Sequence, residues 1–120
     1  LNIINRMIDG YEAMWNALLI KLVEDGKLEE LPEAPIVKAN NVLEYYQEED
    51  IHDNVQLYLL LRKLHRSNPE REQEYRRHVT MRTVIDGREE IVNIDIITNY
   101  YHMQKQFLGW LFKQYDEDEE

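Results

Sequence analysis

The sequence predicts an α-rich α+β domain: a bundle of about four or five helices with one β-hairpin, at about residues 78–94, inserted before the last helix. Three observations lead to this prediction. Apolar residues recur at helical spacing over most of the 120-residue chain. The spacing changes to strict alternation on both sides of Asp86-Gly87, a dipeptide typical of tight hairpin turns. Helical spacing then returns after Asn93.

The first helix has the clearest pattern, because its apolar residues lie three or four positions apart over more than five turns. Gly26 follows where a left-handed C-terminal cap is expected. Gly10, inside the pattern, lowers helix stability by about 1 kcal/mol relative to alanine, so we expect close packing there. The apolar positions are Ile4, Met7, Ile8, Tyr11, Met14, Trp15, Leu18, Leu19, Leu22 and Val23.

A second and a third helix follow an acidic connector. Pro35 suits the first turn of the second helix, where a missing N–H is harmless. Asp50 is a candidate N-cap of the third helix, with Asp53 in its first turn. Residues 57–61 are apolar on every side of that helix, which predicts a central position in the bundle.

A short fourth helix is predicted from Pro69 up to the hairpin, in which Ile85 should face Arg88. An isolated two-stranded hairpin is marginally stable in water, so this one should lie on the helices or pair with another chain. Asn93 or Asp95 caps a long last helix that runs to about Tyr115. We therefore expect one domain, residues 1–115, and an acidic tail, residues 116–120.

Composition limits the function classes. The net charge of −10 disfavours nonspecific attraction of the whole molecule to DNA or to anionic membranes. The chain has no cysteine, which is compatible with any compartment, and no signal peptide is in view, so we expect a cytoplasmic protein. No apolar run approaches the roughly 18 residues that span a bilayer, so we expect no membrane span. Its four glycines are not grouped into a phosphate-binding loop, and no cofactor is predicted.

A basic island, residues 62–88, interrupts this acidic chain. It holds eight of the 14 Lys and Arg residues and only four acidic residues. Salt bridges within the protein explain such a cluster, and so does a surface that binds RNA or another polyanion through the guanidinium groups. The candidate binding residues are Arg62, Arg66, Arg76, Arg77 and Arg82.

Two residues of the basic island are candidates for catalysis. Arg71 and His78, with six residues between them, resemble the Arg-x(4–6)-His signature of HEPN-type ribonucleases. That resemblance implies an all-α, often dimeric domain that cleaves RNA without a metal. The histidine would transfer a proton and the arginine would stabilise the phosphate charge. His78 departs from the pattern, because it lies where helical spacing gives way to strand spacing.

Acidic residues around the second and third helices offer another alternative. Glu30 and Glu33 match the first half of the paired-acid motif of all-α nucleotide pyrophosphohydrolases. Asp50 and Asp53 take the place of its second half, but with Asp-x-x-Asp spacing. The resemblance implies a divalent cation held by oxygen ligands. A solvated loop and an acidic helix start explain the same residues without any metal.

The last helix carries half of the twelve aromatic residues and few charges. One face is expected to hold Ile97, Leu108 and Phe112, while Phe107 and Trp110 fall towards another. Aromatic side chains beyond a single face are typical of protein interfaces. We therefore expect a small non-catalytic interaction or regulatory module that forms a homo-oligomer or binds another protein, with Phe107 and Trp110 at the interface.

Overall fold

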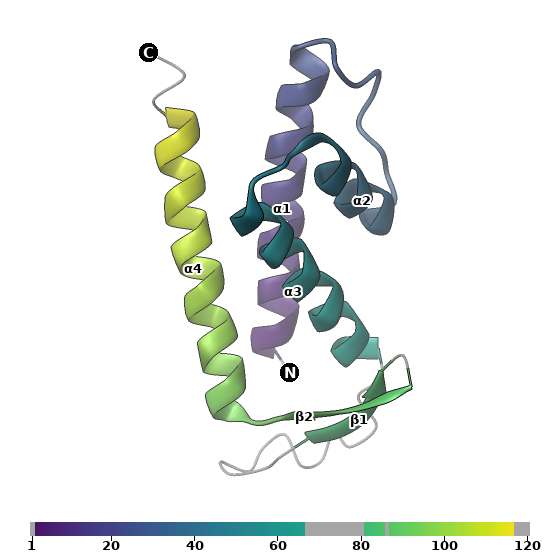
Figure 1. The fold of residues 1–120 in the computed structure, drawn as a ribbon, viewed down its shortest axis with the longest axis vertical. Helices are drawn as coiled ribbons and strands as arrows, with labels where there is room; N and C mark the ends of the chain where they lie inside the picture. The colour runs from purple at the N-terminus through teal and green to yellow at the C-terminus, as the bar shows by residue number, and fades with distance from the viewer. Residues whose placement is uncertain (1, 67–80, 86, 117–120) are drawn as a thin grey trace.

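Four helices form the body of the protein (Figure 1). The computed structural model describes residues 2–66, 81–85 and 87–116. The helices are α1 (Asn2–Glu24), α2 (Pro35–Tyr45), α3 (Glu49–Arg66) and α4 (Ile94–Asp116). Two short strands, β1 (Met81–Ile85) and β2 (Arg88–Val92), pair antiparallel between α3 and α4, with Ile85 opposite Arg88 and a φ of 79° at Gly87.

The predicted α+β fold class is wrong, because the architecture is that of an all-helical bundle. Among the residues whose side-chain burial the structure describes, the buried ones all come from the four helices. The paired strands lie at one end of the bundle (Figure 1) and form no layer of it. Alternating residues predict local strand pairing, but they do not say whether the strands join the core. The short helix predicted from Pro69 lies outside the described residues.

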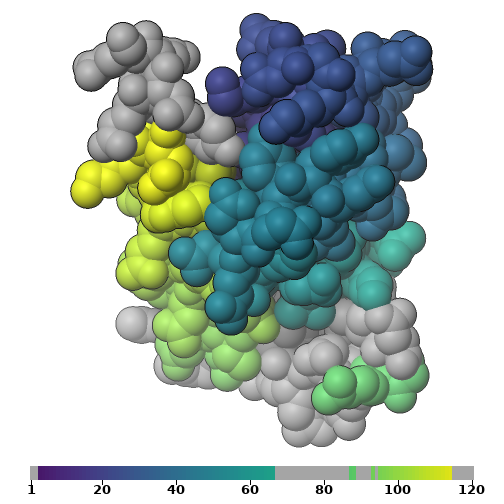
Figure 2. All heavy atoms as spheres, turned by 45° about the horizontal axis from the view of Figure 1, so that its top comes forward, coloured from purple at the N-terminus to yellow at the C-terminus, as the bar shows by residue number. Residues whose placement is uncertain are grey.

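The third helix, α3, packs against all three other helices, as its predicted central position requires. Helix α1 is equally central. Nine of its apolar side chains are buried, and it packs against α2, α3 and α4. Figure 1 shows α4 running in the same direction as α1, and Figure 2 shows the atoms of α3 directly against those of α4. The buried residues of α1 are Ile4, Met7, Ile8, Tyr11, Met14, Trp15, Leu18, Leu19 and Leu22, as the helical spacing predicts.

The ends of the helices follow from local sequence. Gly26, with a φ of 79°, ends α1, and the N–H of Lys27 donates to the Leu22 carbonyl oxygen at 2.9 Å. Asn93 caps α4, because its Oδ1 accepts a hydrogen bond from the N–H of Ile96 at 2.9 Å. The predicted cap at Asp50 is wrong. Helix α3 begins at Glu49, which places Asp50 in the first turn. There the helix dipole stabilises the negative charge of its side chain.

Candidate functional site

One side of α1 is closed by aromatic rings. The Tyr11 and Trp15 rings stack with centroids 5.3 Å apart, and the Tyr58 ring of α3 meets both rings edge-on. Phe107 of α4 lies 6.0 Å from the Trp15 ring. The Tyr11 hydroxyl donates to Asn54 Oδ1 at 2.5 Å. The side chains of Tyr11, Trp15 and Tyr58 are therefore fully buried between the helices.

Arg62, the first residue of the basic island, is held by an interaction inside the protein. Its Nη1 lies 3.3 Å from Glu12 Oε2, which also accepts a hydrogen bond from the Tyr58 hydroxyl at 2.8 Å. Burial, with the hydrogen bond and charge of Glu12, raises the pKa of Tyr58 above its usual value, although the Arg62 charge opposes the shift. Arg62 therefore links α3 to α1, which is the structural explanation of this part of the basic island.

Most of the basic island lies outside the described residues. Arg71, Arg76, Arg77 and His78 all fall there, so the predicted RNA surface and the HEPN-like pair stay predictions. Of the remaining candidates, Arg66 is exposed at the end of α3. The backbone of Arg82, on β1, pairs with Ile91 of β2.

Of the acidic candidates, Asp50 and Asp53 lie on α3, whereas Glu30 and Glu33 lie in the exposed connector before α2. Asp50 and Asp53 border a small hollow of about 150 Å³ between α3 and α4, beside Met103 and Trp110. Among the residues that the structure describes, no three His, Asp or Glu side chains come together in a group that could hold a metal ion. The arrangement in this part of the chain therefore lends no support to a pyrophosphohydrolase metal centre.

The structure divides the aromatic residues of α4 differently from the sequence prediction. Phe107 is 4% exposed, and it contacts Trp15 and stacks on Trp110 with ring centroids 6.0 Å apart. Trp110 is half-buried and packs against the core. Phe112, by contrast, is 59% exposed. The predicted interface residue Phe107 is thus inside the protein, and Phe112 exposes a larger fraction of its surface than any other aromatic residue of α4 whose burial the structure describes.

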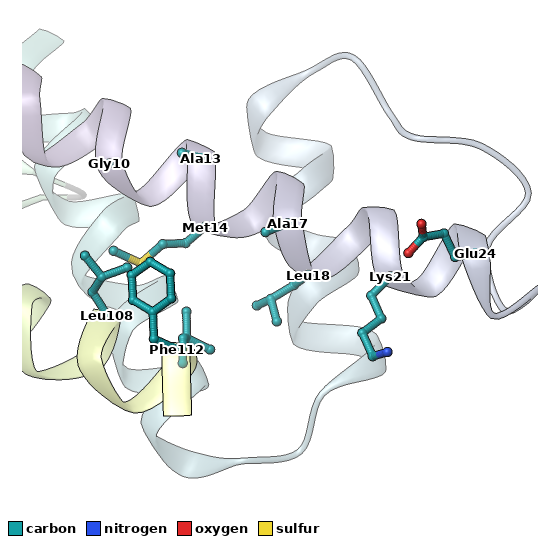
Figure 3. Close-up of a pocket in the computed structure, with 10 residues that line it drawn as sticks. Gly10, Ala13, Met14, Ala17, Leu18, Lys21, Glu24, Leu108 and Phe112 are labelled. Atoms are coloured by element: carbon teal, nitrogen blue, oxygen red, sulfur yellow. The ribbon is translucent and has the colours of Figure 1, made fainter. Parts of the chain in front are cut away.

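An open apolar groove lies on the other side of α1, between it and α4. Its volume is about 580 Å³. Figure 3 shows Met14 and Leu18 of α1 in the groove, with Leu108 and Phe112 of α4 beside them. Ala13 and Ala17, also in the lining, are exposed. Lys21 and Glu24 supply the two charged side chains of the lining, at the end of the groove near the C-terminus of α1 (Figure 3).

Beside the groove, at Gly10, α1 and α4 are held together by a direct contact. The buried Gln104 side chain donates from Nε2 to the Met7 carbonyl oxygen at 2.7 Å. A Cβ atom on Gly10 would lie 3.1 Å from the same Nε2, so glycine permits this approach. The sequence predicted close packing at Gly10 but did not predict the groove. The feature that could have indicated the groove is the apolar pair Leu108 and Phe112, one turn apart in a helix with few charges.

Comparison of the chain with protein-family models, with curated proteins and with solved structures found no match. In the part of the chain that the structure describes, no helix combines the length and the apolar character needed to cross a membrane. The groove between α1 and α4 has about 580 Å³, against about 150 Å³ for the hollow beside Asp50, and its lining is mostly apolar.

Proposed function

We propose that the protein is a non-catalytic interaction module that self-associates through the groove between α1 and α4. The observation that carries the proposal is the exposed Phe112 side chain at the edge of a 580 Å³ apolar groove. Exposed apolar area lowers the free energy when it is removed from water, by about 25 cal/mol per Å². A contiguous apolar surface of this kind is typical of a protein contact site.

A second copy of the chain is the favoured occupant, because the surface contains both a projection and a hollow. Phe112 projects beside the groove, and the small side chains of Ala13 and Ala17 leave room opposite it. In a two-fold symmetric dimer, the same patch of both subunits must be complementary to itself. A projecting aromatic ring next to an apolar hollow meets that requirement.

The charge distribution of α4 also supports a protein contact. Between His102 and Gln114 the helix carries only Lys105 and Lys113. Depletion of charge around exposed aromatic side chains is what distinguishes the centre of an interface from the rest of a protein surface. Residues 103, 108 and 112 supply exposed apolar side chains in this stretch of α4.

Size-exclusion chromatography with light scattering tests the proposal. At high micromolar concentration the protein should have about twice the chain mass of 14.6 kDa. Ala17→Glu and Phe112→Ser should each weaken the dimer by about 100-fold or more, because each change alters the centre of the contact in both subunits. Both side chains are exposed in the single chain, so neither change should unfold it.

Val37→Glu is the matched control. Val37 is 47% exposed on α2, away from the groove, so this variant loses apolar surface without altering the proposed contact. It should keep the mass of the unaltered protein. A single-chain mass for the unaltered protein at high micromolar concentration contradicts the proposal, and so does equal dissociation by Val37→Glu and Ala17→Glu.

A further inference from the structure

The face of α1 beside the groove carries a second row of residues at regular spacing. Steps of four and three residues alternate along it, which is the spacing of a seam between two packed helices. Five members of the row are exposed, and Gly10 is half-buried. The row therefore has the pattern of a helix contact without a helix on it among the described residues. Its members are Arg6, Gly10, Ala13, Ala17, Ile20 and Glu24.

We infer that α1 packs antiparallel against α1 of a second copy, about a two-fold axis that passes between Ala13 and Ala17. This inference rests on the proposed self-association and adds the orientation and the residues that select it. With the axis at this point, Ala13 lies opposite the partner's Ala17. Gly10 then lies opposite the partner's Ile20, and Arg6 lies opposite the partner's Glu24.

Charge complementarity selects this orientation. In the antiparallel pair, Arg6 meets the partner's Glu24 at both ends of the contact, because the two-fold axis repeats each interaction. A parallel pair in register would instead place Arg6 beside Arg6 and Glu24 beside Glu24, and like charges across a contact repel. Both side chains are exposed, and neither forms an ion pair with the residues that the structure describes.

Shape complementarity favours the same register. Ile20 is 45% exposed, and it lies opposite the partner's Gly10, which has no side chain of its own. Ala13 and Ala17, at the centre, allow the two helix backbones to approach closely. Figure 3 shows Ala13 and Ala17 on successive turns of α1, level with the groove. The contact thus has alanines of both copies at its centre and a glycine opposite an isoleucine at each side. Because the two-fold axis repeats each pair, this surface is complementary to itself.

Phe112 lies at the height of the axis. Helices α1 and α4 run in the same direction, and Gln104 of α4 is hydrogen-bonded to Met7 of α1. Each helical residue rises about 1.5 Å, so Phe112, eight residues beyond Gln104, is level with residue 15 of α1. The exposed rings of the two copies would therefore meet near the axis and cover the groove.

A charge exchange tests the orientation. Arg6→Glu and Glu24→Arg should each raise the dissociation constant of the dimer by about tenfold, since each places like charges at both ends of the contact. The double variant restores opposite charges, and its dissociation constant should lie within about threefold of that of the unaltered protein. Sedimentation equilibrium measures all four constants. Arg66→Glu with Glu44→Arg, two exposed residues outside the groove, is the control and should leave the constant unchanged.

The outcomes separate the two proposals. An unaltered protein that stays a single chain overturns the self-association itself. Two results would overturn the antiparallel pairing but not self-association. In one, the single changes leave the dissociation constant of the dimer unaltered. In the other, the double variant binds no more tightly than the single variants.

Disulfide trapping provides a second measurement, because the chain contains no cysteine. The Ala13→Cys and Ala17→Cys variants are mixed after one of them is lengthened by a tag, so that the products differ in size. Oxidation should give mainly the mixed dimer, which joins position 13 to position 17. Dimers that join 13 to 13 and 17 to 17 in preference to the mixed product would show a parallel arrangement and overturn the inference.

Discussion

The two sides of α1 differ although their residues alternate along a single helix. Tyr11 and Trp15 are fully buried against the rings of α3 and α4, whereas Ala13 and Ala17 remain exposed beside an open groove. The difference lies in side-chain volume, since large aromatic rings fill the space between helices and alanines leave it open. The chain thus closes one side of this helix by itself and leaves the other side open.

The closed side gains stability from buried rings even where its polar groups are imperfectly satisfied. Trp15 is fully buried, and its Nε1 has no hydrogen-bond partner among the described residues. An unsatisfied buried donor costs about 1–3 kcal/mol, which is comparable to the stabilisation from burying one large apolar side chain. The ring must therefore be held by contacts with several neighbours, here Tyr11, Tyr58 and Phe107.

Substitution of two phenylalanines on α4 gives the strongest test of the difference between the two sides of α1. Phe107→Ala removes a ring from the closed side and should lower the free energy of unfolding by about 3–5 kcal/mol. Phe112→Ala removes a ring that is 59% exposed and should lower it by less than about 0.5 kcal/mol in the single chain. Urea unfolding at a protein concentration too low for dimers measures both. Similar losses for the two variants would mean that the sides do not differ as described.

High pH should weaken the closed side. Burial raises the pKa of both Tyr11 and Tyr58 above the usual value near 10, and Glu12 adds to the shift at Tyr58. Because the folded state binds these protons more tightly, the stabilisation is complete below about pH 10 and is lost as the pH rises above it. Each tyrosine should contribute a slope of about 1.4 kcal/mol per pH unit there.

Urea unfolding at a series of alkaline pH values measures that slope. Tyr58→Phe removes one of the two groups, so its free energy of unfolding should fall less steeply with pH than that of the unaltered protein. The same slope in both proteins would show that Tyr58 ionises equally well in the folded and unfolded chain.

The smallest expected effect concerns the contact at Gly10, beside the groove. Gly10→Ala gains about 1 kcal/mol of helix propensity, but its Cβ would meet Gln104 Nε2 at 3.1 Å and disturb the hydrogen bond to Met7. We expect little net stabilisation in the unaltered chain and the full gain of about 1 kcal/mol in a Gln104→Ala background. Thermal melts of the four proteins measure the difference. An equal gain in both backgrounds would mean that Gly10 is not needed for the approach of α4.

Local signals in the sequence predicted the parts of the fold that depend on neighbours along the chain. The helical spacing identified the buried residues of α1, Gly26 was identified as a helix end, and Asn93 was one of the two predicted caps of the last helix. Each of these features is decided within one or two helical turns. The fold class was missed because the alternating pattern near Asp86-Gly87 dominated the prediction, while four helices alone supply the buried core described here.

The candidate site was harder to predict, because it depends on contacts between distant residues. Two apolar pairs lie on neighbouring faces of α4: Phe107 with Leu111, and Leu108 with Phe112. The two pairs are equally apolar, so the sequence alone does not show which pair faces inward. The Trp15 ring makes that choice by packing against Phe107, which leaves Phe112 outside. Arg62 was expected on a binding surface for a similar reason, since its partner, Glu12, is 50 residues away.

The parallel course of α4 beside α1 has a consequence for the order of folding. Helices α1, α2 and α3 follow one another directly, whereas α4 reaches α1 through contacts such as Gln104 to Met7, 97 residues apart. Closing so long a loop costs entropy, so we expect α4 to dock after the first three helices have assembled. Because α4 supplies Leu108 and Phe112, the groove does not exist before that last step. Two chains could therefore pair through it only once each has finished folding.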